Sequence, residues 1–193
     1  MSEKPASLPT AIDGWRFDIS ADMDVTLVQP YDAAWPGWFQ QIKTFLESGL
    51  VEVACTIEHV GSTSVPGMVA KPTIDLDIVT PQAAFPAVKA RLETLGYVHL
   101  GDLGLPGREA FDLVDAENRG RLPEHHLYVC EEGMYELRKH LAFRDFMRRH
   151  PEWRDRLNRL KQELCVNHNN DRQAYIDGKS EMVAEITSLA MGA

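Results

Sequence analysis

The sequence predicts an α/β (α+β) domain, a mixed sheet flanked by helices, with a C-terminal helical segment. Strand-like and helix-like runs alternate between residues 51 and 131, which indicates a sheet of roughly four to six strands. From Gly133 onward, apolar residues recur at helical spacing. The composition is that of a globular protein, since 44% of the 193 residues are hydrophobic and 25% are charged. A chain of this length can bury a substantial core.

A single domain is expected over residues 23–190. Residues 1–22 lack periodicity and contain two prolines, so we expect them to form a loose N-terminal arm. Residues 23–131 are expected to form the α/β core, and residues 132–193 to form helices packed on that core. Helices are expected at 36–46, 85–95, 133–149, 152–167 and 172–190, and strands at 51–59, around Asp75 and Asp77, and at 97–100, 110–114 and 126–130.

Proline, glycine and aspartate residues predict where several of these helices begin or end. Pro36 and Pro86 suit the first turn of a helix, where a missing N–H costs little. Gly96 suits the end of the helix that begins near residue 85. Asp171 is an acceptable N-cap for the last helix, because its carboxylate can accept a hydrogen bond from a free N–H group.

Two carboxylates, Asp75 and Asp77, lie at the centre of the expected site. Side chains two apart on a strand share a face, so these carboxylates project together while Ile74, Leu76 and Ile78 face the core. Carboxylates this close repel each other unless a cation lies between them. Mg²⁺ (or Mn²⁺) prefers such oxygen ligands. The alternative is a pair of solvated side chains at a strand end.

A turn of small residues, Gly61, Ser62, Thr63 and Ser64, ends the preceding strand about a dozen residues before Asp75. Glycine lets backbone N–H groups approach a phosphate closely, and hydroxyl groups add further contacts. Glycine and serine are also common in ordinary turns, which is the alternative interpretation. Together, the turn and the paired aspartates favour a site for a nucleotide and a metal ion.

A glycine-serine turn followed by Asp-x-Asp on a strand resembles the nucleotidyltransferase superfamily. More closely, HVGSTSVPGMVAKPTIDLDIV (59–79) resembles the GrpB family. The similarity covers roughly residues 25–190 and includes PYDAAWPGWF (30–39), EHHLYV (124–129), LAFRDFMRRHPEW (141–153) and the Leu-Lys pair at 160–161. The resemblance implies a nucleotidyltransferase-like fold, in which the turn lies beside a metal-binding pair of carboxylates.

Members of that superfamily usually carry a third acid on a later strand, and Asp112 and His126 compete for this position here. The family resemblance favours His126, where relatives tend to have His-Leu-His and this chain has Tyr128 in place of the second histidine. An imidazole can bind a metal or act as a base, but it adds no negative charge. Asp75, Asp77 and His126 are therefore the expected catalytic residues, with Asp75 and Asp77 as metal ligands.

Basic side chains are expected to contact the phosphates. Lys71 lies in the loop that joins the two site strands, where a lysine could reach a triphosphate. Arg144 and Arg148 are four residues apart and so share one helix face. The family resemblance includes Arg144, Lys161 and Lys179, which makes these three residues candidates for phosphate binding. A solvated loop or helix face is the alternative for all of them.

The implied activity is metal-dependent transfer of a nucleoside monophosphate from a nucleoside triphosphate to an unknown small-molecule or protein acceptor. The imperfect third acid leaves one alternative, a non-catalytic regulatory module that binds a nucleotide or a coenzyme. If the two aspartates are only solvated surface side chains, a structural interaction domain is expected instead.

Charge and apolar content limit the expected partners. The net charge of −9 argues against unspecific binding of nucleic acid, which depends on a basic surface. No signal peptide and no apolar run near about 18 residues is found, so a cytoplasmic protein without a membrane partner is expected. A second copy of the chain, in a homodimer, is a candidate partner. Three scattered cysteines indicate neither a zinc ribbon nor a disulfide framework.

Overall fold

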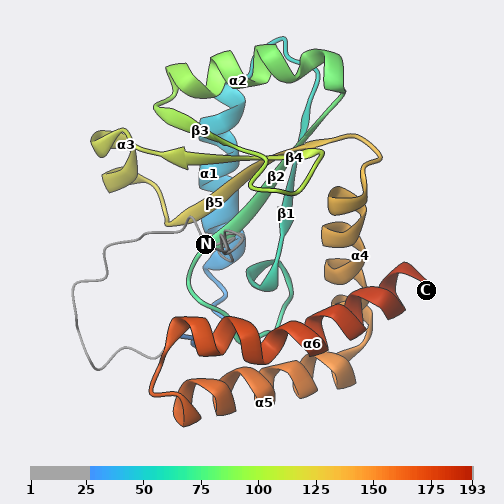
Figure 1. The fold of residues 1–193 in the computed structure, drawn as a ribbon. Coiled ribbons are helices and arrows are strands. Elements are labelled where there is room, and N and C mark those ends of the chain that lie inside the picture. The colour runs from blue at the N-terminus through green and yellow to red at the C-terminus, as the bar shows by residue number, and fades with distance from the viewer. Residues whose placement is uncertain (1–26, 193) are drawn as a thin grey trace, which may run out of the picture.

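The computed structural model describes residues 27–192, and Figure 1 shows their arrangement. The arm expected at residues 1–22 lies outside the described residues. Within the described part, five strands form one sheet in the order β1-β2-β5-β4-β3. The strands are β1 (Thr56–Val60), β2 (Ile74–Thr80), β3 (Tyr97–Gly101), β4 (Arg108–Leu113) and β5 (His125–Glu131).

The sheet is mixed, as the sequence predicts. β2 pairs antiparallel with β1 and parallel with β5, and β4 pairs antiparallel with β5 and with β3. In this register Asp75 lies opposite Val60 on one side and His126 on the other. The carboxylate of Asp75 therefore lies between the end of β1 and the start of β5.

Helices cover both faces of the sheet (Figure 1). α1 and α2 pack on one face, and α4 packs on the other, beside α5 and α6. The C-terminal helices thus form a small bundle that packs against the sheet. The helices are α1 (Trp35–Gly49), α2 (Phe85–Thr94), α3 (Ala116–Arg121), α4 (Tyr135–Arg149), α5 (Pro151–Asn167) and α6 (Arg172–Met191), with short 3₁₀ turns η1 (Ser62–Ser64) and η2 (Gln82–Ala84).

The main core lies between the sheet and the pair α1 and α2. Ile74, Leu76 and Ile78 of β2 are fully buried there, which is the alternation expected from their spacing. Burying one such side chain contributes about 1.5–3 kcal/mol relative to leaving it in water. Because the period of a strand is two, this core directs Asp75 and Asp77 to the opposite face.

A second core fixes the segment between η1 and β2. Val65 and Met68 of that segment are fully buried against Met147, Leu157 and Ile186 of the three C-terminal helices. The connection that carries the small-residue turn into β2 is therefore packed into the helical bundle. The bundle positions the turn as well as covering the sheet.

Two elements differ from the sequence prediction. β1 begins at Thr56 rather than at residue 51, because the chain turns after α1 and Glu52 has a φ of 65°. α3 was not predicted, since its six residues show no apolar periodicity. It begins where the Asp115 side chain accepts a hydrogen bond from the Asn118 N–H group. The predicted N-cap of α6 is confirmed, as Asp171 accepts from the Ala174 N–H group at 2.7 Å.

Candidate functional site

The small-residue turn meets the first aspartate in space. Gly61 follows β1 directly and has φ 67° and ψ −166°, a conformation that only glycine adopts readily. A side chain at this position would also overlap the Asp75 carboxylate. The hydroxyl of Ser64 donates to the Gly61 carbonyl at 2.7 Å and closes the turn. Two independent constraints, backbone conformation and the nearness of Asp75, thus require glycine here.

Thr63, inside the same turn, is held by His59 at the end of β1. Nε2 of His59 lies 3.0 Å from the Thr63 hydroxyl, and its ring stacks on Phe39 of α1. Burial, with a smaller contribution from two nearby arginines, lowers the pKa of His59 to about 4. The imidazole is therefore neutral at pH 7 and acts as a hydrogen-bonding support for the turn.

Asp75 lies beside His126, the residue favoured as the third site group. Nδ1 of His126 is 2.9 Å from Oδ1 of Asp75, and the Asp75 side chain is 30% exposed. Burial raises the pKa of Asp75, but the hydrogen bond and charge of His126, with the charges of His140 and Lys179, outweigh it. The net pKa lies below its usual value. Asp75 is thus an ionised carboxylate that reaches solvent.

The competing residue, Asp112, lies elsewhere. Its Oδ1 accepts a hydrogen bond from Arg119 of α3 at 3.0 Å, and both residues line a small depression at the other side of β5. Of the two candidates, the structure brings His126 to Asp75 and leaves Asp112 in an exposed ion pair.

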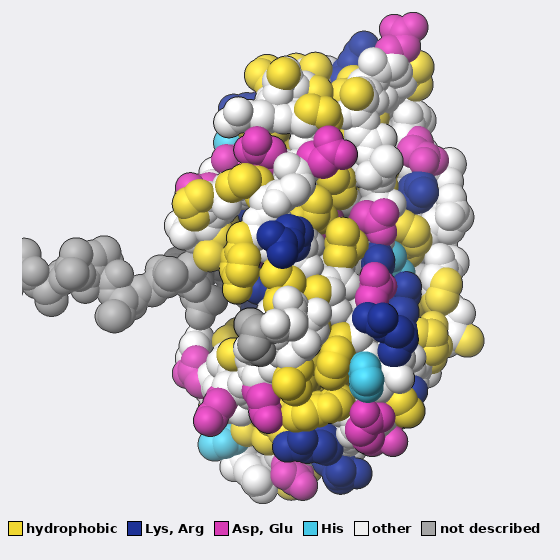
Figure 2. All heavy atoms as spheres, turned by 90° about the vertical axis from the view of Figure 1, so that its right-hand side faces the viewer, with side chains coloured by type: hydrophobic (Ala, Val, Ile, Leu, Met, Phe, Trp, Pro, Cys, Tyr) yellow, Lys and Arg dark blue, Asp and Glu magenta, His cyan; other side chains and the backbone are white. Residues whose placement is uncertain are grey.

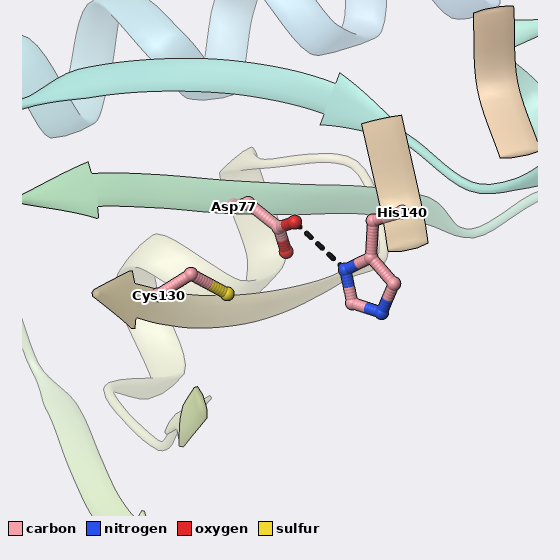
Figure 3. A group of neighbouring side chains, drawn as sticks. All are labelled: Asp77, Cys130 and His140. Atoms are coloured by element: carbon pink, nitrogen blue, oxygen red, sulfur yellow. Dashed lines mark hydrogen bonds and ion pairs between the residues drawn. The ribbon is translucent and has the colours of Figure 1, made fainter. Parts of the chain in front are cut away.

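Asp77 shares the face of Asp75 but is completely buried. Its Oδ2 lies 2.7 Å from Nδ1 of His140, a residue of α4, and Cys130 of β5 lies next to it (Figure 3). The two aspartates therefore differ in their access to solvent. Asp75 is open to a ligand, whereas His140 and α4 close off Asp77.

Two adjoining cavities meet at Asp75. The smaller has a volume of about 270 Å³ and lies against the start of α6, and the larger has about 880 Å³ and lies between α4 and α6. Ser62, Asp75 and Lys179 line both of them. We refer to the two cavities together as the Asp75 cleft.

Several lysines line the Asp75 cleft. Lys71 and Lys179 lie over the ring of Tyr175, with Nζ 5.2 and 4.9 Å from its centroid. Burial, together with the charges of Arg172 and Lys179, lowers the pKa of Lys71 to about 8. Burial also lowers the pKa of Lys179. Cationic groups crowded into a partly dry cleft in this way are stabilised by an anion.

Lys161 is the most buried of these lysines, with 2% of its surface exposed. Its Nζ donates to the hydroxyl of Ser62 and to the carbonyl of Val69, each at 2.8 Å. Burial lowers its pKa to about 7, and the charge of Lys179 acts in the same direction. Lys161 lines the larger cavity, so its amine lies between the turn and the open space.

Arg144 and Arg148 are used differently. Arg144 donates to Glu58 at 2.7 Å, to the His59 carbonyl at 3.1 Å and to Asp145 at 2.8 Å. Arg148 donates twice to the Ser64 carbonyl, at 2.7 and 3.0 Å. Neither arginine lines the Asp75 cleft. Both instead connect α4 to β1 and to the turn.

Sequence reasoning missed His140, Arg172 and Tyr175. His140 lies four residues before Arg144 on the same face of α4, which is the one signal that could have found it. Arg172 and Tyr175 open α6 and line the smaller cavity. No pattern in the sequence places the start of α6 beside β2, because that contact depends on how the bundle packs.

The fold is that of the nucleotidyltransferases. A variant of the Cid1 poly(U) polymerase bound to MgATP superposes with a TM-score of 0.50 and 12% sequence identity, over 72% of this chain and 43% of that chain. At this identity the likeness shows the fold alone. No helix in the described part of the chain is long and apolar enough to span a membrane.

The chain belongs to the GrpB family, whose model matches residues 25–189. The crystal structure of the conserved protein GrpB from Enterococcus faecalis is similar, with a TM-score of 0.73 and 28% identity, over 86% of this chain and 97% of that one. The UPF0157 protein PA4798 of Pseudomonas aeruginosa is 35% identical over 186 residues, which is 96% of this chain and 75% of that protein.

Proposed function

We propose that this protein transfers a nucleoside monophosphate from a Mg²⁺-bound (or Mn²⁺-bound) nucleoside triphosphate to a small-molecule or protein acceptor. The observation that carries the proposal is the junction of Gly61 and Asp75 at a cleft that Lys71, Lys161 and Lys179 line. The fold supports it, because the Cid1 polymerase variant of the same fold holds MgATP.

The triphosphate is assigned to the turn and the lysines. Ser62 and Thr63 line the cleft, and their hydroxyl groups are held by Lys161 and His59. The amines of Lys71, Lys161 and Lys179 surround the single carboxylate of Asp75 there. The cleft is thus locally basic in a chain whose net charge is −9, so an anion is attracted to this place rather than to the surface as a whole.

Asp75 is the primary ligand in this proposal, because it is ionised and open to the cleft. Its carboxylate suits Mg²⁺, a hard cation that prefers oxygen ligands. Asp77, the second acid of this face, is fully buried and bonded to His140, so it lies behind the cleft. When bound, Mg²⁺ neutralises phosphate charge and polarises the α-phosphate.

In the transfer step an acceptor oxygen attacks the α-phosphorus, and the bond from that phosphorus to the bridging oxygen of the β-phosphate breaks. The neutral form of His126, which lies beside Asp75, accepts the proton of the acceptor hydroxyl. Lys161 and Lys179 stabilise the charge of the departing pyrophosphate. Arg144 keeps β1 and the turn in place through Glu58 and the His59 carbonyl, rather than contacting phosphate directly.

The acceptor is expected to be a small molecule or a protein. Figure 2 shows that Lys and Arg side chains on the face beside α4 are interspersed with Asp and Glu and separated by a band of hydrophobic groups. A nucleic-acid acceptor needs a continuous basic surface, which this face does not offer.

A release assay tests the proposed activity. The full chain is incubated with Mg²⁺ and each of the four common nucleoside triphosphates, with and without a pool of cellular small molecules, and pyrophosphate is measured. Release that depends on Asp75 is expected. Asp75→Asn removes the charge at nearly constant shape, and Asp112→Asn is the matched control outside the cleft.

A regulatory module that binds a nucleotide or a coenzyme without turnover is the second candidate. One observation favours it: among the acids that the structure describes, Asp75 alone lines the cleft, and β5 places His126 and Tyr128 there instead of a third acid. This module predicts saturable binding with no pyrophosphate under any condition.

A further inference from the structure

Three metal-binding side chains of different chemistry converge behind Asp75. They are the carboxylate of Asp77 on β2, the thiol of Cys130 on β5 and the imidazole of His140 on α4. One donor atom from each lies within 4.8 Å of the others. Figure 3 shows the three side chains pointing toward one another.

The hydrogen bonding of the Asp77 carboxylate in this cluster is incomplete. Asp77 is completely buried, and its Oδ2 is partnered by His140 at 2.7 Å. Its Oδ1 is also buried and accepts no conventional N–H or O–H hydrogen bond from a described residue; the neighbouring Cys130 thiol is a weak donor to this carboxylate. Burial and the charge of Asp77 raise the pKa of that thiol, so it stays protonated until a cation binds. A buried carboxylate oxygen with only a weak donor is costly, because little replaces the water that it loses. The free lone pairs of Oδ1 are what a cation would use.

The cluster borders the Asp75 cleft at His140. His140 is 20% exposed and lines the larger cavity of the Asp75 cleft, so one edge of the trio borders that space. A metal site needs suitable ligands and an entry route. Asp77 and Cys130 are fully buried, so an ion would have to enter from the cleft past the His140 side chain.

We propose that Asp77, Cys130 and His140 bind a divalent transition-metal ion of the Zn²⁺, Co²⁺ or Fe²⁺ class. A thiolate with an imidazole suits these borderline ions, whereas Mg²⁺ selects oxygen ligands only. Three protein ligands leave a fourth position for water or a substrate oxygen, which is the arrangement of a catalytic rather than a structural zinc site. Binding converts the Cys130 thiol to a thiolate, and the released proton goes to solvent.

This site adds a second metal to the proposed function, and the metal can bind whether or not a nucleotide binds. It gives the second aspartate a metal of its own, while Asp75 alone faces the triphosphate. The two aspartates, two residues apart on β2, would then serve two different ions.

Cobalt titration tests the proposal. The full chain is stripped with a chelator, and Co²⁺ is added while absorbance is recorded. We expect one equivalent to produce a sulfur-to-cobalt charge-transfer band in the near ultraviolet with intense visible d–d bands. Zn²⁺ should remove these bands, and excess Mg²⁺ should not.

Variants separate the ligands. Cys130→Ser should abolish the charge-transfer band, and His140→Gln should weaken Co²⁺ binding about tenfold or more. Cys165→Ser, which changes another buried thiol, should leave both band and affinity unchanged. Circular dichroism identifies any variant that does not fold. If one of Cys130→Ser and His140→Gln does not fold, the other tests the metal site.

The proposal is overturned if the wild-type chain shows no charge-transfer band, or if the band persists in folded Cys130→Ser. Cobalt bands in a chain that does not bind nucleoside triphosphate would support this site while rejecting the proposed function. Nucleotide binding without cobalt bands would reject this metal site and leave the proposed function standing.

Discussion

The buried amine of Lys161 donates to the hydroxyl of Ser62 at 2.8 Å and thereby joins α5 to the small-residue turn. The same amine donates to the Val69 carbonyl, further along the segment that leads to β2. One side chain from the helical bundle thus holds two points of the connection between the site strands. The position of the turn beside Asp75 depends on the bundle as much as on the sheet.

Lys161 should make stability depend on pH. Its pKa is about 7 in the folded protein because of burial, against an ordinary value of 10.5. Between these values the unfolded chain binds more protons, so the free energy of unfolding rises with pH, with a slope approaching about 1.4 kcal/mol per pH unit. Lys161→Met removes this contribution. Urea denaturation of both proteins at pH 7, 8 and 9 measures the difference.

Lys89→Met, at a partly exposed position of α2 beside Glu93, is the control and should follow the wild-type pH profile. If wild type and Lys161→Met gain stability in parallel from pH 7 to 9, the amine is not held as described.

Gly61→Ala should damage both the fold and the site. The backbone conformation at Gly61 costs other residues about 1–3 kcal/mol, and the new methyl group would overlap Asp75. We expect a loss of stability of at least that size and a displaced Asp75 carboxylate. Thermal unfolding measures the first effect, and nucleotide titration the second.

Gly37→Ala provides the comparison, because Gly37 lies inside α1 with open space at its Cβ position. It should stabilise the protein by about 0.5–1 kcal/mol. Equal stability of the two variants would contradict the assigned role of Gly61.

Arg144→Gln should lower stability while leaving nucleotide affinity nearly unchanged. The change breaks the ion pair with Glu58 and leaves the His59 carbonyl without this donor, a cost of about 1–3 kcal/mol. Arg149→Gln, on the exposed side of α4, should have little effect. A large loss of nucleotide affinity with intact stability would instead assign Arg144 to the phosphates.

Nucleotide binding should be coupled to proton uptake near pH 8. Burial lowers the pKa of Lys71 to about 8 and that of Lys161 to about 7, so both amines are partly neutral there. A triphosphate favours their charged forms and raises both pKa values. Calorimetric titrations at pH 8 in buffers of different ionisation enthalpy should therefore show net proton uptake, reduced in Lys71→Gln. Proton release on binding would contradict this arrangement.

The sequence predicts the mixed α/β architecture, and the family resemblance implies that the turn lies beside the first aspartate. Apolar alternation fixed the core face of β2, and an antiparallel partner that ends in a glycine turn must bring that turn near Asp75. These are local relations between neighbouring strands. The predicted boundaries were wrong where the sequence carries no clear pattern. The start of β1 was placed too early, and α3 was not predicted.

The rest of the site depends on contacts between distant residues. The burial of Asp77 results from His140, which lies 63 residues later on α4. Strand periodicity makes Asp75 and Asp77 equivalent, and only the packing of α4 distinguishes them. For the same reason, sequence spacing could not show that Lys161 is buried or that Arg144 is paired with Glu58.

The central claim is that Asp75 and the adjoining turn bind a cation-bound polyphosphate, and isothermal titration of ATP in the presence of Mg²⁺ tests it most directly. We expect saturable binding by the wild-type chain and by Asp112→Asn, lost when Mg²⁺ is removed and lost in Asp75→Asn. Unchanged affinity in a folded Asp75→Asn variant, or no binding by the wild-type chain to any nucleoside triphosphate, would contradict it.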